Sequence, residues 1–227
     1  MLEHDTKIVT PTAIALFPHL VEPDLYEGSL DYKVSLILDP SVEAAATLIA
    51  NIEEIVAAQL AVSIKELQAG SGKDKALAKQ IEGHSPLLPE FDEEGDETGR
   101  MILKVKSKAA GVTGKGKKWE RKINIFDSGN GPTGKPALIP HGTVDIWGGS
   151  LLKVELKVNR YFAKGLKKAG VSFYIEAVQV IELKTGGGSG GDGFGIEEGG
   201  YEAPSDTFGD PGGTEGGDPY NQEGGDF

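Results

Sequence analysis

Cysteine is absent from the 227-residue sequence, which excludes a disulfide framework and any chemistry that needs a thiolate. Long hydrophobic runs are also absent, since none approaches the roughly 18 apolar residues of a membrane-spanning helix. The first residues, Met1–Asp5, are charged and lack the apolar core of a signal sequence. From these absences we expect a soluble, intracellular protein with no membrane partner.

Histidine is scarce, and no catalytic set can be assembled from the sequence. The glycine-rich stretch Gly129–Lys135 resembles a phosphate-binding loop, but Pro136 follows the lysine where that motif requires a hydroxyl residue. No nucleophile lies beside a plausible base. We therefore predict a non-enzymatic protein without a metal or cofactor. The histidines are scattered without metal-ligand spacing, at His4, His19, His84 and His141.

Basic residues are absent from the last 42 residues, Gly186–Phe227, which contain ten acidic residues and 16 glycines. Such a segment cannot bury enough apolar surface to offset its ordering entropy, so we expect it to be disordered. Residues 1–185 carry 23 basic and 25 acidic side chains, so the acidity belongs to the tail. We predict a folded domain over 1–185 and a disordered tail over 186–227. The end of the tail should bind a basic, grooved partner through Glu223, Asp226 and Phe227.

Alternating apolar and polar residues mark the strands of the folded domain. In the stretch 31–38, one face carries Tyr32, Val34, Leu36 and Leu38. The stretches His19–Gly28 and His84–Gly99 are expected to be loops. The predicted strands are Lys7–Phe17 (an edge strand, or two short ones divided at Pro11), Asp31–Leu38, Arg100–Lys108, Lys117–Phe126, Thr143–Trp147, Leu151–Phe162 and Val171–Leu183.

One long helix is predicted after the second strand. Asp39 as N-cap and Pro40 in the first turn signal its start, and its apolar stripe runs to about Ala69. Lys73–Gly83 adds a short helical turn. A single strong helix does not suit a parallel α/β sheet, which needs a helix after most strands. The pattern favours a β-barrel of the oligonucleotide-binding (OB) fold, five-stranded with Greek-key connections, one long inserted α-helix and a disordered acidic C-terminal tail.

Two stretches rich in basic residues contain embedded aromatic residues. Residues 104–122 include eight basic residues and one acid, and residues 153–168 include six basic residues and one acid. Lysine and arginine neutralise phosphates, and a flat aromatic ring stacks on any base without reading sequence. We therefore predict a groove for single-stranded nucleic acid. Its candidate contact residues are Lys104, Lys106, Lys108, Lys118, Trp119, Arg121, Lys153, Lys157, Arg160, Tyr161, Phe162 and Lys164.

Other interpretations of these stretches are open at this point. Alternating lysines also suit a solvated strand face, with Trp119 or Phe162 in the core, in which case the protein is a structural or interaction scaffold. Phosphate contacts and stacking serve RNA as well as DNA, so an RNA-binding or annealing protein is a further alternative. Duplex DNA is disfavoured because the long helix has no basic face to serve as a recognition helix.

The order of these features resembles the single-stranded DNA-binding protein of short-tailed (T-seven-type) bacteriophages. The resemblance rests on the strand-to-helix junction YKVSLILDP, the stretch PLLPEFDEEGDETG, the segment INIFDSGNG, the block IWGGSLLKVELKVNRYF, and the acidic tail ending in Gly-Asp-Phe. It covers most of the chain. It implies an OB-type fold that binds single-stranded DNA without sequence preference, a homodimer, and a place in phage DNA replication and recombination in the cytoplasm of an infected bacterium.

The same resemblance assigns roles to two parts of the chain. The acidic tail is implied to contact the phage DNA polymerase and helicase-primase, with Phe227 as the tip that engages them. An aromatic pair after the second basic strand, at Arg160-Tyr161-Phe162, is implied to contact DNA. Because Tyr161 and Phe162 are adjacent, they point to opposite faces of a strand, so only one of them is expected to stack on a base. We further expect the tail to occupy the basic groove when DNA is absent, and to leave it when DNA binds.

Overall fold

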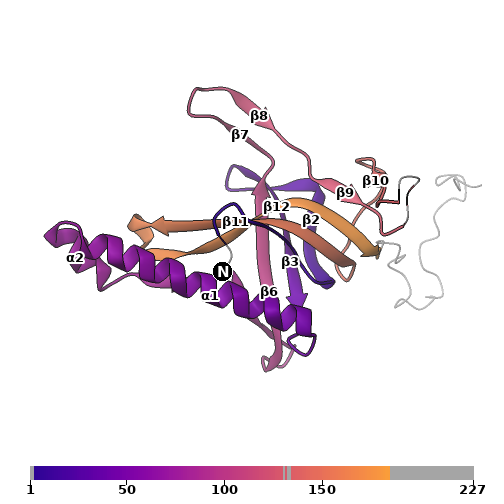
Figure 1. Ribbon diagram of the computed structural model, residues 1–227. Helices are drawn as coiled ribbons and strands as arrows, with labels where there is room; N and C mark the ends of the chain where they lie inside the picture. The colour runs from indigo at the N-terminus through magenta and orange to yellow at the C-terminus, as the bar shows by residue number, and fades with distance from the viewer. Residues whose placement is uncertain (1–2, 130, 132–133, 185–227) are drawn as a thin grey trace, which may run out of the picture. The chain divides into compact units, whose positions relative to one another are not determined.

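Residues 3–129, 131 and 134–184 are described by the computed structural model, and the tail predicted to be disordered, 186–227, lies outside them. The described chain is mostly β-sheet with one long helix (Figure 1). Ten of its strands form one sheet, and two more form a separate hairpin. The prediction of a mostly β domain with a long inserted helix is therefore confirmed.

Five long strands form the centre of the sheet: β2 (Ala13–Tyr26), β3 (Ser29–Leu38), β6 (Glu97–Lys108), β11 (Leu151–Ala163) and β12 (Lys168–Glu182). They are antiparallel to their neighbours, in the order β12-β11-β2-β3-β6.

Shorter strands extend the sheet beyond the five strands of the predicted barrel. They are β1 (Lys7–Val9) on β11, β4 (Glu82–His84) and β9 (Asn124–Phe126) on β12, β10 (Leu138–Ile139) on β9, and β5 (Leu87–Phe91) on β6. The first predicted strand is indeed divided near Pro11, but its second part is not at an edge, because β2 pairs with both β11 and β3.

The core lies on one face of the long strands, as the alternation predicted. Tyr32, Val34, Leu36 and Leu38 of β3 are all buried. On β11 the alternate residues from Leu152 to Val158 are likewise buried, and on β6 the residues between the lysines are buried. Removing apolar side chains from water at these positions is the main force that holds the sheet together.

The two ends of the five-strand run, β6 and β12, approach each other. The buried Ser107 hydroxyl on β6 donates to the carbonyl of Ile175 on β12 (3.0 Å), and the Arg121 guanidinium donates to the same oxygen. Within the described residues no backbone pairing joins these two strands. The sheet is therefore curled around its core, with side-chain hydrogen bonds where its ends meet.

The long helix, α1 (Glu43–Gln68), lies against β12, β11 and β3 (Figure 1). It begins later than predicted: its N-cap is Val42, and no side chain caps it. Asp39 instead accepts a hydrogen bond from the backbone N–H of Ser41 (2.8 Å), which fixes a turn before the helix. By length and composition α1 could cross a membrane, but in this fold Ile52 and Ile55 are fully buried against the sheet.

A short helix, α2 (Gly72–Ala78), falls where a helical turn was predicted. It starts with a capping box, in which Ser71 and Asp74 each satisfy a backbone N–H of the other. Behind it, Leu67, Ala78 and Ile81 form a second hydrophobic cluster, separate from the main core.

The predicted loop His19–Gly28 is wrong, because β2 continues through most of it. Phe17 has a positive φ of 48°, and the β2–β3 register shifts twice along the strand. Irregularities of this kind allow Pro18 and Pro23 within a strand, since their missing N–H groups are not needed for the ladder there.

The predicted loop His84–Gly99 is also wrong, because it contains β5 and the start of β6. The Asp92 carboxylate accepts hydrogen bonds from the backbone N–H groups of Glu94 (3.1 Å) and Asp96 (2.8 Å), and Gly95 has a φ of 90°. Asp92, Glu94 and Asp96 therefore lie in the tight turn of a hairpin that joins β5 to β6.

The predicted strand Lys117–Phe126 is divided in two. Its first part, β8 (Lys118–Glu120), pairs with β7 (Ala110–Val112) in the separate hairpin, and its second part is β9. Arg121 separates them because its backbone N–H donates to Ala109 (2.8 Å). Thr143–Trp147 is not a strand: the Thr143 hydroxyl donates to the Pro140 carbonyl (2.7 Å) in a turn.

Candidate nucleic-acid interface

The lysines of β6 lie on its outer face. Lys104, Lys106 and Lys108 are exposed, as the alternation predicted. Lys106 forms an ion pair with Asp31 of the neighbouring strand β3 (3.4 Å). Among the described residues, neither Lys104 nor Lys108 is in an ion pair. These two cations are available for phosphates without first losing an acidic partner.

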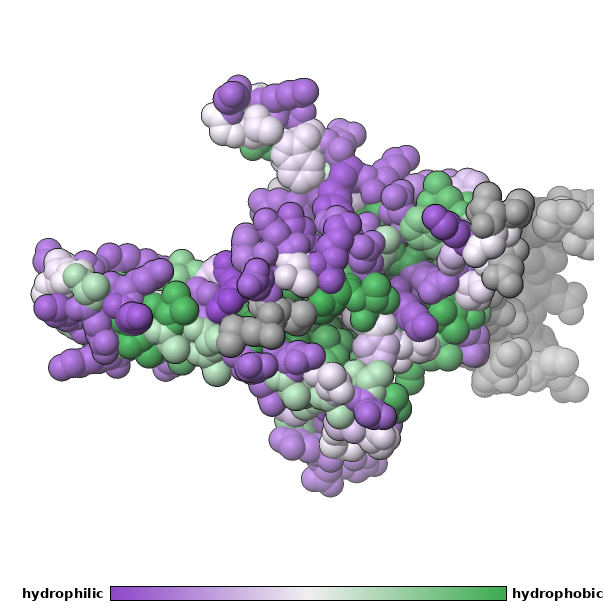
Figure 2. Space-filling model, viewed as in Figure 1, coloured by the Kyte–Doolittle hydropathy of each residue, from purple (hydrophilic) through white to green (hydrophobic). Residues whose placement is uncertain are grey.

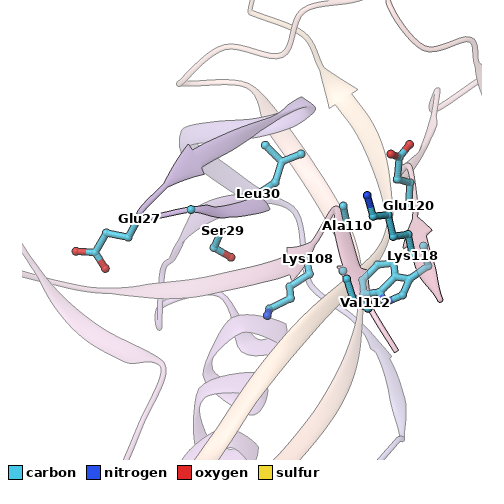
Figure 3. A pocket seen from close by; sticks show the side chains of 11 residues that line it. Glu27, Ser29, Leu30, Lys108, Ala110, Val112, Lys118 and Glu120 are labelled. Atoms are coloured by element: carbon cyan, nitrogen blue, oxygen red, sulfur yellow. The ribbon is translucent and has the colours of Figure 1, made fainter. Parts of the chain in front are cut away.

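Lys108 leads into a cleft at the base of the β7–β8 hairpin, with a volume of about 460 Å³. The cleft lies between this hairpin and the β2–β3 corner, where the turn contributes Glu27 and the start of β3 contributes Leu30 (Figure 3). Trp119 and Lys118 of β8 also line it. Three residues predicted from sequence, Lys108, Lys118 and Trp119, are therefore brought together in one cleft.

Trp119 is held by a glycine on the opposite strand. Gly111 is its cross-strand partner, and a Cβ placed on Gly111 would come within 2.8 Å of the indole ring. The ring therefore lies close against backbone that carries no side chain, and it is only partly buried. This arrangement fixes the indole while leaving part of its surface open to a ligand.

The hairpin itself is strongly basic. Lys115, Lys117 and Lys118 are exposed, and within the part of the chain that the structure describes none of them is in an ion pair. The hairpin projects from the main sheet and its surface is mostly hydrophilic (Figures 1 and 2). Two acids, Glu120 and Glu27, line the cleft at its base together with Lys108 and Lys118, so the lysines of the hairpin and cleft outnumber these acids.

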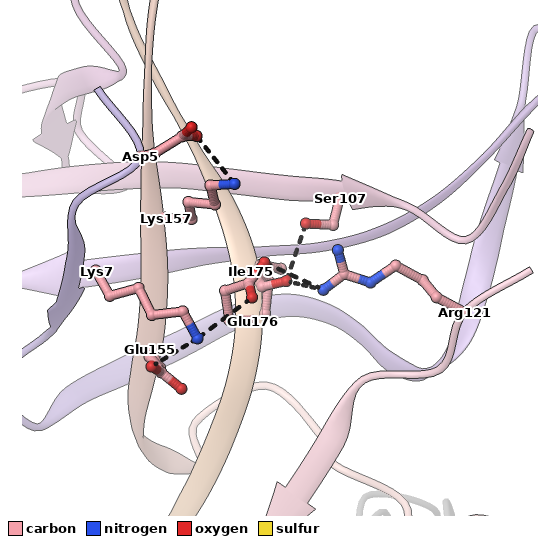
Figure 4. A network of polar contacts seen from close by, with 8 residues as sticks. All are labelled: Asp5, Lys7, Ser107, Arg121, Glu155, Lys157, Ile175 and Glu176. Atoms are coloured by element: carbon pink, nitrogen blue, oxygen red, sulfur yellow. Dashed lines mark hydrogen bonds and ion pairs between the residues drawn. The ribbon is translucent and has the colours of Figure 1, made fainter. Parts of the chain in front are cut away.

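A network of ion pairs connects the hairpin to the outer face of β11 (Figure 4). Arg121 lies 3.7 Å from Glu176, which also pairs with Lys7 (3.5 Å). Lys7 in turn pairs with Glu155 (3.3 Å). This network is a continuous line of charged groups that runs from Arg121 through β12 and β1 to β11. Arg121 is held at β12 by its hydrogen bond to the Ile175 carbonyl.

Lys157 lies in the same region and is paired with Asp5 (2.9 Å). Its ammonium group holds the pKa of the Asp5 carboxyl below the ordinary value, and Glu155 raises the pKa of Lys7. Lys153, two residues before Glu155 on the same outer face, is in no ion pair among the described residues. The cations of β11 are thus partly neutralised by acids of the chain itself.

The aromatic pair at the end of β11 points to two opposite faces, as adjacent positions on a strand must. Phe162 packs against the second hydrophobic cluster behind α2. Tyr161 is on the other face, with its hydroxyl within hydrogen-bond distance of His84 Nδ1. Partial burial raises the pKa of the Tyr161 hydroxyl. Of the two rings, Tyr161 is the one on the same face of β11 as Lys153.

Arg160 and Lys164 are committed to contacts within the chain. The Arg160 guanidinium donates to the Gln59 side chain of α1 (3.1 Å), on the helix side of β11. Lys164 pairs with Asp74 of α2 (2.6 Å). Lys164 and the Ser71 hydroxyl together hold the pKa of Asp74 at about 2. The predicted tail residues Glu223, Asp226 and Phe227 lie outside the described residues.

Sequence reasoning missed Lys7, whose role depends on β1 pairing with β11 far along the chain. Its only local signal was its place beside the β-branched residues of β1. Among the described residues, no group of three or more histidine, aspartate and glutamate side chains is arranged to hold a metal ion.

Comparison with solved structures places this arrangement among known folds. The chain is similar to gp2.5, a single-stranded DNA-binding protein encoded by bacteriophage T7, with a TM-score of 0.64 and 24% identity over 88% of this chain and 99% of that one. The chain shares its fold with that protein. The resemblance noted from the sequence is thereby confirmed at the level of the fold.

The single-stranded DNA-binding protein of bacteriophage Enc34, in complex with single-stranded DNA, is a more distant match. Its TM-score is 0.47 and its identity 12%, over 79% of this chain and 88% of that one. No protein-family model matches the sequence, and no curated protein matches it.

Proposed function

We propose that this protein binds single-stranded DNA without sequence preference. The observation that carries the proposal is the cleft that Trp119 lines together with Lys108 and Lys118. A fixed, partly open indole offers a stacking surface for any base, and the two lysines offer positive charge for the adjacent phosphates.

The path of the strand follows from the exposed cations. It runs along the outer face of β6 past Lys104 and Lys108 into the hairpin cleft. From there it crosses β12 toward Lys153 and Tyr161 on β11. The shared fold with a phage protein named for single-stranded DNA binding supports the proposed ligand. On this reading the curled sheet is an OB-type barrel whose outer surface serves as the binding face.

The biological role that we propose is protection of single-stranded DNA during phage DNA replication and recombination, in the cytoplasm of an infected bacterium. The protein acts as a homodimer without catalytic activity. Its acidic tail, residues 186–227, recruits the phage DNA polymerase and helicase-primase through Glu223, Asp226 and Phe227. The tail also competes with DNA for the basic surface, since ten acidic residues and no basic ones lie in it.

A competition experiment tests the proposed ligand. Labelled single-stranded DNA bound to the full chain is challenged with unlabelled single-stranded DNA of several sequences, with RNA, and with duplex DNA. We expect all single-stranded DNA sequences to compete equally and duplex DNA to compete poorly. Equal or stronger competition by RNA would favour the RNA-binding alternative, and no binding to any of them would favour a scaffold.

The role of the tail has its own test. Deleting Phe227 alone should leave DNA binding unchanged, because that residue is not part of the basic surface. It should abolish binding of the polymerase in a pull-down. Retention of polymerase binding without Phe227 would contradict the assigned role of the tail tip.

A further inference from the structure

A second cleft lies on the outer face of the sheet where β9, β12, β11 and β1 run side by side. Its volume is about 350 Å³, near the lower end of the roughly 300–1,000 Å³ range of small-molecule sites. Phe126 of β9 and Pro136 line one side, and Val9 of β1 lies on the far side. Ala177 of β12 lies between them, where its small side chain leaves room.

The strand register puts three side chains of different chemistry in one row across this cleft. Phe126 pairs with Gln179 of β12, and Gln179 pairs with Lys153 of β11. The Gln179 side-chain amide donates to the Asp127 carbonyl (3.1 Å), which fixes its orientation beside the Phe126 ring. An aromatic ring, an oriented amide and a cation thus lie on three adjacent strands, and neighbouring strands are spaced about 4.8 Å apart.

The charge around the cleft favours an anionic ligand. Glu155 lines it, but its carboxylate is already paired with Lys7 (3.3 Å). Lys153 and Lys135 also line it, and in the described part of the chain neither is in an ion pair. The cleft therefore combines apolar walls with two uncompensated cations.

We propose that this cleft is a nucleobase subsite, in which one unstacked base lies against the Phe126 ring. Gln179 lies beside the edge of the base, and Lys153 and Lys135 contact the flanking phosphates. A ring with phosphates on both sides matches the apolar walls and the positive rim together, whereas a purely apolar ligand would leave both lysines unused. The subsite rests on the proposed single-stranded DNA binding, to which it adds a specific stacking residue outside the hairpin cleft.

Stacking can be separated from phosphate binding by comparing two ligands, short oligo-dT and an abasic strand of the same length. In the full-length chain, Phe126→Ala should weaken binding of oligo-dT by about 5- to 140-fold, the range expected for one base–aromatic stack. Binding of the abasic strand should change little. Phe126→Trp should restore oligo-dT binding.

Two further variants make the result specific. Phe91→Ala removes an exposed aromatic from β5, at the other edge of the sheet, and should leave both affinities unchanged. Ala177→Leu fills the cleft without removing the Phe126 ring, and should weaken oligo-dT binding as Phe126→Ala does. It keeps the proposal testable if Phe126→Ala fails to fold.

The outcomes distinguish failure of the subsite from failure of the proposed function. If the wild-type chain binds neither strand, the function itself is wrong. If wild type binds but Phe126→Ala and Ala177→Leu bind oligo-dT as well as wild type does, the function holds and the subsite is wrong. Equal weakening on both strands would show a merely structural role for Phe126. Tighter DNA binding by Phe126→Ala would show that the acidic tail occupies the cleft, and would also overturn the proposal.

Discussion

Removing the unpaired cations of the proposed DNA path should flatten the salt dependence of binding. Lys104, Lys108 and Lys118 are exposed, and among the described residues none is in an ion pair. Each should therefore release a counterion from DNA on binding, which contributes about 0.7 to the slope of log affinity against log salt for single strands. Changing all three to glutamine should lower that slope by about 2.

This change in slope is large enough to measure. Between 50 and 200 mM salt, the loss of affinity should be roughly 20-fold smaller for the triple variant than for wild type, on the basis of three lost phosphate contacts. Fluorescence anisotropy of a labelled oligo-dT at four or five salt concentrations provides the slope. The triple variant should also bind more weakly than wild type at every concentration in this range.

A matched control changes three lysines that already have acidic partners. Lys33, Lys164 and Lys184 pair with Asp24, Asp74 and Glu182. The control triple variant, also to glutamine, removes the same formal charge but no counterion-releasing contact, so its slope should stay near that of wild type. An equal fall in slope for both variants would refute the reasoning, because binding would then depend on net charge and not on these positions.

Three other predictions test separate parts of the structure. Gly111→Ala should displace the Trp119 ring and weaken oligo-dT binding by about 5-fold or more. The melting temperature should change little, because the hairpin lies outside the main sheet. Unchanged affinity would argue against Trp119 as a stacking residue. Leu156→Ala should lower the free energy of unfolding in urea by about 2–5 kcal/mol, since Leu156 is fully buried; a loss below 1 kcal/mol would mean that the core is not packed as described. Asp74→Asn should be less stable than wild type at pH 7. Because the folded-state pKa of Asp74 is depressed to about 2, the difference in free energy of unfolding between the two proteins should close as the pH falls from about 4 to 2. A difference that stays constant over that range would exclude the Lys164 ion pair as its cause.

The parts of the fold that could be predicted are those with a strong local pattern. One face of β3, β6 and β11 is buried and the other is not, so apolar and polar residues alternate along each of them. The long helix was recognised from its apolar period for the same reason. By contrast, β4 consists of three residues that pair in parallel with β12, more than 80 positions away. No local pattern marks such a strand, because its partner decides its conformation.

The candidate site divides in the same way. That Lys104, Lys106 and Lys108 share an exposed face follows from their spacing alone. That Lys106 is paired while the other two are not depends on Asp31, which β3 brings beside it. Phe126 was overlooked because the residues that share its cleft include members of β11, β12 and β1, which lie far from it in sequence.

The two aromatic residues at the end of β11 show where sequence reasoning stopped. Their adjacency predicted opposite faces, and the structure has them so. Which of the two rings is packed inside could not be decided from the local sequence. Phe162 packs against the second hydrophobic cluster, whose Leu67 and Ala78 belong to α1 and α2 and lie far away in sequence.

The most direct test of the central claim is fluorescence anisotropy of a labelled single strand of about 30 nucleotides. It is titrated with the full-length chain and with a chain ending at residue 185, at low and at moderate salt. Our account predicts tight binding by both, weakening with salt, and tighter binding by the shorter chain at low salt because ten competing acidic residues are gone. Absence of binding by either chain at low salt would contradict the claim that this protein binds single-stranded DNA.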